Sequence, residues 1–442
     1  MGTPLLIAKT LPNIKRMITN LQFKSDKINI TPDFPCVLMG MEDSKQSEGI
    51  FSKLEVNTMV FKNGEKNIYF ISIDTLFITN ELKRSTNELI NNVFGQANEI
   101  DIIQVSSHTH YAPALEDKRI KLGKKDEKYF SFLLSQLESL FKNLKSIPFV
   151  EVELKYSEQV SKGITCNRRR RARSISNYLN SFIAMEPNPK GFIDERFKRL
   201  NIYNSVNQKL MGTMWSFPCH PTNFPNKTLI SSEFPGEIRN YIRRLNETDA
   251  TVIYFPGFAG DVRAVPPKRR SFLKLIRTIF QLSYPVSYYR FSNIEEYTAW
   301  KDSLVEIFAK IDSDENILNC EGATLETKTS EEPLKSLGIE VEDINSLQFR
   351  QIKIGQDFAF YTISAEPVGK YSEIFNSNIN DKFAICTGYT DSVFGYLPMQ
   401  SQVTEGGYES EGFFDAFLVR GQFNNKIEKT VISHIKKFNN VR

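Results

Sequence analysis

The 442-residue sequence predicts an α/β fold in which mixed β-sheets are flanked by helices. Strand-type and helix-type patterns alternate along most of the chain, which is typical of sheets covered by helices. In addition, polar motifs directly follow five of the expected strands, at positions far apart in the sequence. Because ligands bind at the carboxyl ends of strands in open α/β sheets, we expect the active site at this edge.

The first clear element is a hairpin over residues 57–74. Its β-rich runs flank Asn63-Gly64, a dipeptide that strongly favours a two-residue turn. A helix follows, because apolar residues recur at helical spacing from Leu82 to Phe94 and Gly95 then provides a stop. The segment 99–107 is the next strand, and His108 comes directly after it. This order predicts a βαβ unit with histidine at the end of its second strand.

Later strands lead to polar motifs in the same way. The motifs are PCHPTNF with His220, PGFAGDVRAV, AEPVGKY with Glu366, and YTDSVFGYLP, which follow strands expected at 209–217, 250–255, 348–364 (a hairpin) and 382–388. One sheet-based unit explains such recurring strand ends better than a string of independent modules does. We therefore expect a single catalytic domain over residues 1–442.

Composition excludes several classes of protein. Hydrophobic residues make up 40% and charged residues 24%, as in ordinary globular proteins, and a formal charge of +4 is too weak to indicate nucleic-acid binding. The chain has no run of 18 apolar residues and no signal-peptide core, so we expect a cytoplasmic protein. Its five cysteines are widely spaced and are expected to be reduced thiols.

Three of the four histidines, His108, His110 and His220, come after expected strands, and Glu366 occupies an equivalent position. Zinc binds histidine nitrogens and carboxylate oxygens that a rigid scaffold holds at separated points. The alternative is that the HxH pair satisfies loop backbone. The matching positions of His220 and Glu366 favour a metal site. The fourth histidine, His434, lies among apolar residues at helical spacing and is expected to be an ordinary helix residue.

An ordered set of motifs over about residues 28–410 resembles the neutral (non-lysosomal) ceramidase family. The motifs are TPDFPCVLMGM, SSHTHYAPA, CNRRR, WSFPCHPTNF, LISSEFPGEI, PGFAGDVRAV, ISAEP and GYLPMQSQVTEGGYE. They resemble that family's ITGPxxxxxMxGY, HTHSGP, NRSP, HPTSM, SSDNxGY, AGDVSPN, PGEFT and YVTTxEEYxxQRYE segments. Each motif alone is weak, whereas the ordered set is specific. The resemblance implies a neutral-ceramidase-like catalytic domain.

The resemblance also implies roles for individual residues. The implied ligands of a Zn²⁺ ion are His108, His220, Glu366 and Tyr396. The catalytic candidates are His110, which would line the site beside the metal, Arg168 and Tyr408, which would face the scissile amide, and Asp261. Asn167 is a candidate for substrate binding, and Arg263 is another because of its charge, although it departs from the family pattern.

These residue types suit hydrolysis of an amide. Zinc polarises a carbonyl and activates water, an arginine and a tyrosine hydroxyl can stabilise an oxyanion, and a nearby imidazole can move a proton. We therefore expect a zinc-dependent hydrolase that cleaves an N-acyl amide bond in a lipid or glycan substrate by zinc-activated water. The alternatives are a deacetylase acting on an N-acetyl amino sugar in glycan biosynthesis, or a non-catalytic family member that retains the fold as a binding protein.

The chain departs from the family at Arg263, which replaces the serine of GDVS that is proposed as a nucleophile. A covalent acyl-enzyme through that serine is therefore excluded. Arg263 either binds an anionic or strongly polar group of the substrate, or pairs with Asp261 or Glu409 to support the fold. The family's secretion signal and C-terminal immunoglobulin-like domain are also expected to be missing.

For two basic segments, the sequence predicts locations or functions outside the site. Residues 168–173 contain five arginines, and apart from Arg168 these are expected on the solvated surface. Residues 266–291 mix basic and large apolar side chains. This segment fits either peripheral contact with an anionic membrane or an insertion helix packed on the domain. The sequence leaves the oligomeric state open.

Overall fold

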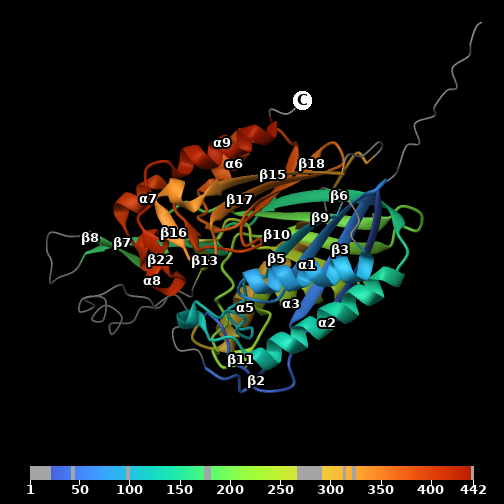
Figure 1. The fold of residues 1–442 in the computed structure, drawn as a ribbon, viewed down its shortest axis with the longest axis horizontal. Helices are drawn as coiled ribbons and strands as arrows, with labels where there is room; N and C mark the ends of the chain where they lie inside the picture. Colours follow the sequence, from blue (N-terminus) through green and yellow to red (C-terminus); the bar gives the residue numbers. More distant parts are fainter. Residues whose placement is uncertain are drawn as a thin grey trace, which may run out of the picture.

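The computed structural model describes residues 21–40, 45–95, 100–173, 181–265, 291–311, 315–320 and 325–439. Within these residues the chain forms two large β-sheets that pack face to face, with helices on both outer sides (Figure 1). The sequence-based α/β assignment with mixed sheets is confirmed.

The larger sheet has nine strands in the described part of the chain. Its order is β12-β10-β9-β6-β1-β3-β4-β5, with β14 pairing with β6. The bounds are β1 Gln22–Asn29, β3 Glu55–Asn63, β4 Lys66–Ile73, β5 Ile100–Ser106, β6 Val150–Val160, β9 Arg196–Asn204, β10 Leu210–Ser216, β12 Thr251–Phe255 and β14 Asn316–Ile317. The pairs β4–β5 and β10–β12 are parallel, and the pairs between the remaining neighbours are antiparallel.

The second of the two large sheets has four strands in the described part of the chain, in the order β15-β17-β18-β20. Its strands are β15 Leu325–Pro333, β17 Ser346–Ile354, β18 Phe358–Ile363 and β20 Phe383–Thr387. Alternate side chains of both sheets meet in a shared apolar core. Phe360 of β18 lies 5.0 Å, ring centre to ring centre, from both Phe70 of β4 and Phe255 of β12. This contact fixes the two sheets against each other and brings their strand ends to one side.

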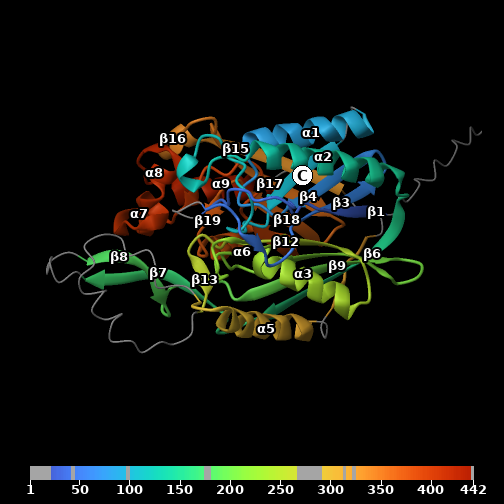
Figure 2. The same ribbon diagram turned by 90° about the horizontal axis from the view of Figure 1, so that it is seen from below.

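Helices cover the outer faces. Figure 2 shows α1 and α2 over one end of the larger sheet and α3 and α5 over the other end. In Figure 1, α6 and α9 lie on the outside of the smaller sheet. The bounds are α1 Asn80–Phe94, α2 Glu127–Ser146, α3 Glu233–Leu245, α5 Ile294–Lys310, α6 Tyr371–Asn378 and α9 Ile427–Asn439.

Short elements surround the ends of the main strands. A three-stranded sheet of β7 Thr165–Arg173, β8 Ser181–Asn188 and β13 Val262–Ala264 extends away from the main body (Figures 1 and 2). Two-residue to three-residue strands pair as β2 Gly49–Ile50 with β11 Leu229–Ile230, β16 Ile339–Val341 with β22 Val419–Gly421, and β19 Glu366–Pro367 with β21 Tyr396–Leu397. Short helical turns are Ile120–Leu122, Leu334–Leu337, α7 Gln400–Glu405, Tyr408–Gly412 and α8 Phe414–Phe417.

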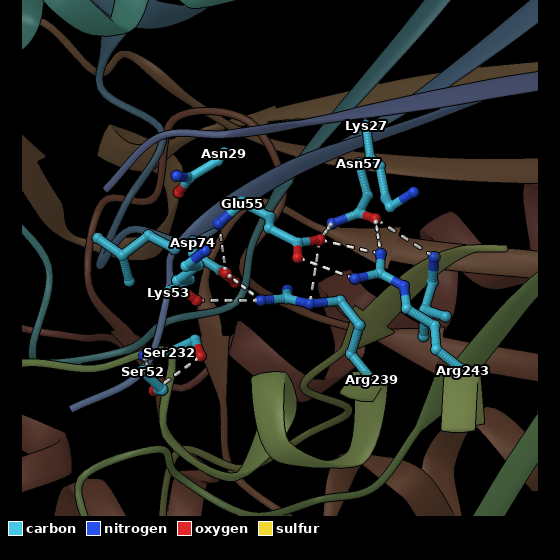
Figure 3. Close-up of polar contacts among 12 residues, drawn as sticks. Lys27, Asn29, Ser52, Lys53, Glu55, Asn57, Asp74, Ser232, Arg239 and Arg243 are labelled. Atoms are coloured by element: carbon cyan, nitrogen blue, oxygen red, sulfur yellow. Dashed lines mark hydrogen bonds and ion pairs between the residues drawn. The ribbon is translucent and has the colours of Figure 1, made fainter. Parts of the chain in front are cut away.

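Ion pairs attach α3 to the edge of the larger sheet (Figure 3). Arg243 donates to both carboxylate oxygens of Glu55 at 2.8 and 2.9 Å. Arg239 lies 3.2 Å from Glu55 and donates to Asp74 at 2.9 Å. At the start of the helix, the hydroxyl groups of Ser52 and Ser232 are 3.0 Å apart. These contacts hold α3 against the start of β3 and the end of β4.

The elements expected from the sequence are present. The hairpin of β3 and β4 is present, but its two-residue turn is Gly64-Glu65 and not Asn63-Gly64, because Asn63 pairs with Lys66. Gly64 has a φ of 58°, in the left-handed region that favours glycine. Helix α1 ends before Gly95, and the β17–β18 hairpin turns at Gly355. No described helix is long and apolar enough to cross a membrane. Of the basic segment 266–291, all but the final residue lies outside the described residues.

Candidate metal centre

The strand ends deliver the expected ligands to one point. His108 follows β5 by two residues, and His220 follows β10 by four. Glu366 begins β19 and Tyr396 begins β21, and the two residues are direct partners in a short parallel pair. Because β5 and β10 belong to the larger sheet while β18 and β20 precede the other two residues, the cluster forms where the two sheets meet.

The three histidines of the cluster are held by backbone carbonyl groups. Nδ1 lies 2.9 Å from the Leu76 carbonyl oxygen in His108, 2.8 Å from that of Gly40 in His110, and 3.3 Å from that of Ala259 in His220. A carbonyl oxygen only accepts hydrogen bonds, so each Nδ1 carries the proton in the neutral ring. Each Nε2 is then left with a lone pair.

These lone pairs converge. Nε2 of His220 lies 3.1 Å from Nε2 of His108 and 3.3 Å from Nε2 of His110. Burial lowers the pKa of His110 and of His220 well below the ordinary value, and the neighbouring His108 lowers both further. Neutral imidazoles that face one another through lone pairs repel, whereas a cation among them would bind all of them.

Glu366 completes this arrangement. One of its carboxylate oxygens, Oε2, lies 3.3 Å from Nε2 of His108 and 3.9 Å from Nε2 of His220. Its side chain is fully buried, and neither carboxylate oxygen has a hydrogen-bond partner among the described residues. A buried carboxylate without partners is costly unless a cation binds it. The donor set of imidazole nitrogens and a carboxylate therefore fits a divalent metal such as zinc, and His108, His110 and His220 form a group that could hold one.

The backbone at the cluster is in an uncommon conformation. His108 and Tyr389 have φ values of 61° and 62°, in the left-handed region that few residues other than glycine adopt. The Tyr389 ring centre lies 4.4 Å from that of His108, and its buried hydroxyl has no hydrogen-bond partner within the described part of the chain. Such conformations persist where the surroundings enforce them, and they gather at functional sites. Sequence analysis missed Tyr389, because only its contact with His108 distinguishes it from other tyrosines.

Gly40 explains the first motif of the resemblance. Its carbonyl oxygen orients His110, and its φ is 96°. A Cβ atom at this position would lie 2.6 Å from Nδ1 of His110. Only glycine therefore allows the backbone to approach the imidazole this closely.

Tyr396 and Tyr408 lie next to Arg168. The Arg168 guanidinium is 5.5 Å from the ring centre of Tyr396 and 5.7 Å from that of Tyr408. The Tyr396 ring is parallel to the His220 ring at 6.4 Å. Burial and the negative charge of Glu366 raise the pKa of Tyr396 well above its ordinary value, so its hydroxyl group is protonated in this structure.

Arg168 belongs to a buried ion-pair group with Arg169 and Glu409. Its Nε donates to Glu409 Oε1 at 2.7 Å, and Nη1 of Arg169 donates to Glu409 Oε2 at 2.7 Å. Nη2 of Arg168 is buried and has no hydrogen-bond partner among the described residues. The expectation that Arg169 lies on the solvated surface was wrong, because its side chain is buried in this ion-pair group. Arg170 and Arg171 do lie on the surface, with side chains that are 58% and 64% exposed.

Asp261 holds neighbouring loops together. Its carboxylate accepts hydrogen bonds from the Gly369 backbone at 2.7 Å, from Asn167 at 2.9 Å and from Gln402 at 3.0 Å. Its carbonyl oxygen accepts from the backbone N–H of Arg168 at 2.8 Å. This pattern places Asp261 and Asn167 behind Arg168, where they can position it.

A cavity of about 350 Å³ opens above the cluster. Its lining includes most of the expected site residues: His110, Arg168, His220, Arg263, Tyr396 and Tyr408. Nη2 of Arg263 donates to the Thr222 carbonyl oxygen at 2.8 Å at the edge of this cavity. A second cavity of about 500 Å³ lies beside Phe77 and Arg119, and none of the expected site residues lines it.

Two sheets packed face to face, with a histidine and carboxylate cluster at their strand ends, define an α/β fold with a candidate metal centre. Solved structures share this fold. Neutral ceramidase from Pseudomonas aeruginosa aligns with a TM-score of 0.70 at 13% identity, over 95% of this chain and 74% of that chain. A ceramidase complexed with C2 aligns with a TM-score of 0.69 at 12% identity, over the same shares. No protein-family model and no curated protein matches the sequence. The structural likeness confirms the expected neutral-ceramidase-like fold.

Proposed function

We propose that this chain is a zinc-dependent hydrolase that cleaves an N-acyl amide bond. The observation that carries the proposal is the convergence of imidazole lone pairs on the Glu366 carboxylate, which has no hydrogen-bond partner in the described ranges. The cluster lies beneath a cavity that Arg168 and Tyr408 also line. The likeness to solved ceramidases supports amide cleavage as the reaction.

The proposed ligands are His108, His220, Glu366 and Tyr396. His110 belongs to the same group of nitrogen atoms but is proposed to lie beside the ion without binding it, so that its Nε2 lone pair stays available for a proton. A bound divalent metal supplies Lewis acidity toward an amide carbonyl and lowers the pKa of water. The residues of the chain provide the remaining functions.

His110 is the proposed proton carrier. Its ring is only partly buried and reaches the cavity, and Gly40 fixes its tautomer so that Nε2 can accept a proton. A neutral imidazole in this position can take a proton from the attacking water and deliver it to the leaving amine. Arg168 lines the cavity, and its Nη2 has no hydrogen-bond partner among the described residues, so this group is proposed to stabilise an oxyanion together with the hydroxyl of Tyr408.

The hydroxyl groups that could replace the family serine are engaged elsewhere. Ser232 contacts Ser52 at 3.0 Å, and Ser364 accepts from the Gln348 backbone at 2.8 Å. Neither residue lines the cavity. This arrangement supports direct attack by water over a covalent acyl-enzyme.

Amine release from N-acyl substrates tests the proposal. With a panel that contains a short-chain ceramide and N-acetylglucosamine, we expect turnover that is abolished by chelation and restored by zinc. His108→Ala with His220→Ala should abolish it, whereas His434→Asn, which changes a histidine bonded to Ser330 and Glu332, should retain it. A folded, zinc-loaded protein that releases no amine from any member of the panel would support a binding role instead.

A deacetylase acting on an N-acetyl amino sugar is the second candidate. Arg168 and Arg263 both line the cavity. Two guanidinium groups favour a polar substrate such as an acylated sugar. In the panel, faster turnover of the sugar than of the ceramide is the corresponding result.

A further inference from the structure

The cavity above the cluster has an excess of cationic side chains. Four cations and one carboxylate line it among the described residues: Lys121, Arg168, Lys227, Arg263 and Asp415. Asp415 forms an ion pair with Lys121, and both of these side chains are more than half exposed. The remaining cations of the lining are Arg168, Lys227 and Arg263, and of these Arg168 is paired with Glu409.

The fold directs Arg263 into this cavity. β13 pairs with β7 in an antiparallel register that places Arg263 opposite Cys166. Val262 and Ala264, on either side of it in the strand, are 0% and 2% exposed and pack into the interior. Because side chains alternate along a strand, Arg263 faces the other way. Its hydrogen bond to the Thr222 carbonyl oxygen then holds the guanidinium beside the loop that carries His220.

Arg263 lies close to the histidines. The carbonyl oxygen of the preceding residue, Val262, accepts a hydrogen bond from the His220 backbone at 2.9 Å, and Arg263 lines the same cavity as His110 and His220. It also interacts with Glu233, but burial raises the pKa of that carboxyl group to about 8. Glu233 does not line the cavity.

Unsatisfied donors accompany these charges. Nη2 of Arg168 and Oγ1 of Thr222 are buried without hydrogen-bond partners among the described residues, and both side chains line the cavity. Buried polar groups of this kind normally have a partner. A ligand oxygen in the cavity would supply one.

We propose that the substrate is a small N-acyl compound that carries an anionic oxygen group, either a carboxylate or a phosphate, which binds Arg263 and Lys227. This inference rests on the proposed hydrolase function and names its substrate class. Arg263 is then a specificity-determining residue, and Arg168 remains available for the oxyanion at the amide. A cavity of about 350 Å³ accommodates a compound of this size.

Matched substrates that differ in charge test the proposal by turnover. One pair is N-acetylglycine and N-acetylglycinamide, and the other is N-acetylphosphoethanolamine and N-acetylethanolamine. We expect the zinc-loaded protein to hydrolyse the anionic member of at least one pair with a kcat/KM about tenfold or more above that of the neutral member. The pair that shows this preference identifies the carboxylate or the phosphate. Equal kcat/KM values within both pairs would overturn the inference and leave the hydrolase function intact.

Variants assign the preference to residues. Arg263→Gln and Lys227→Gln should each reduce the ratio of anionic to neutral kcat/KM severalfold. Lys142→Gln removes a lysine that pairs with Glu138 on the exposed side of α2, and it should leave the ratio unchanged. A ratio that is unaffected by Arg263→Gln contradicts the assignment.

Calorimetric titration of the metal-free protein with the same compounds distinguishes failure of the proposed hydrolase function from failure of the proposed anion binding. If no compound is turned over, the proposed function fails, and binding still decides the inference. An anionic compound should bind about tenfold tighter than its neutral counterpart, with the difference lost in Arg263→Gln and reduced at high salt. Equal affinities for charged and neutral compounds would overturn it.

Discussion

At the scale of single residues, three backbone carbonyl groups determine what the cluster can bind. They fix the proton of each imidazole on Nδ1, so that three Nε2 atoms and the Glu366 carboxylate face the same point. The sequence indicated the histidines and Glu366 because each follows a strand. It could not indicate the carbonyl partners, since Leu76, Gly40 and Ala259 contribute only backbone atoms.

Tyr396 provides the first prediction. It is the register partner of Glu366 and its ring stacks at 6.4 Å on His220, so its hydroxyl is suited to the ion or to the bound water. Tyr396→Phe should lower zinc affinity or kcat by about tenfold or more, with a loss of stability of only about 1 kcal/mol. Zinc titration, steady-state kinetics and urea unfolding measure the three quantities. Unchanged zinc affinity and unchanged kcat would exclude this role.

Gly40 provides a prediction about His110. In Gly40→Ala the new Cβ would approach Nδ1 of His110 at 2.6 Å and displace the ring, so kcat should fall by about 10²-fold. Gly64→Ala is the matched control, because Gly64 also has positive φ but has no atom within 4 Å of an added Cβ. The control should lose about 1 kcal/mol of stability and retain kcat. Equal kcat values in both variants would show that His110 tolerates the displacement.

At the scale of elements, local signals predicted much of the structure. Asn63-Gly64 identified the β3–β4 hairpin, and apolar spacing with Gly95 identified α1. The order of strands was not predictable, because pairings such as β6 with β1 and β9 depend on contacts between distant segments. For the same reason the sequence did not indicate a role for Glu409, which lies 240 residues after Arg169 and accepts a hydrogen bond from it. A run of arginines gives no local sign of which members are buried.

The attachment of α3 to the larger sheet gives a prediction about acid stability. Burial alone would raise the pKa of Glu55, but the charges and hydrogen bonds of Arg239 and Arg243 outweigh it and hold the pKa at about 2. The folded pKa is thus below the unfolded value of about 4.5, so the ion pairs contribute stability above pH 4.5. This contribution is lost as the pH falls from about 4.5 toward 2.

Urea unfolding at pH 5 and pH 3 measures this contribution. Over that interval the wild type should lose about 2 kcal/mol more of its unfolding free energy than Glu55→Gln, whose amide does not titrate. Lys118 pairs with Glu342 at an exposed position, so Glu342→Gln serves as a control that should follow the wild type. Parallel pH dependence in wild type and Glu55→Gln would contradict the role of this ion-pair group.

At the scale of the whole molecule, the candidate site exists only when distant parts of the chain are folded together. Its residues extend from Gly40 to Tyr408 and come from both large sheets and from the small sheet of β7, β8 and β13. A metal bound there favours the folded state over the unfolded chain, because the unfolded chain lacks a preformed site. The sequence could place the motifs in order along this fold, whereas the charge and size of the cavity became visible only in three dimensions.

Metal removal therefore affects global stability. Chelation followed by dialysis should lower the melting temperature by several degrees, and added zinc should restore it. Scanning calorimetry measures the change. His108→Ala with His220→Ala should melt at the same temperature with and without zinc. A zinc-dependent shift of equal size in this double variant would show that the stabilising ion binds elsewhere.

The metal content of the purified protein tests the central claim most directly. Elemental analysis after dialysis against a metal-buffered solution should find about one zinc ion per chain in the wild type. It should find none in the His108→Ala, His220→Ala variant, whose circular dichroism spectrum should match that of the wild type. A fully folded wild-type protein that takes up no divalent metal under these conditions would contradict the account.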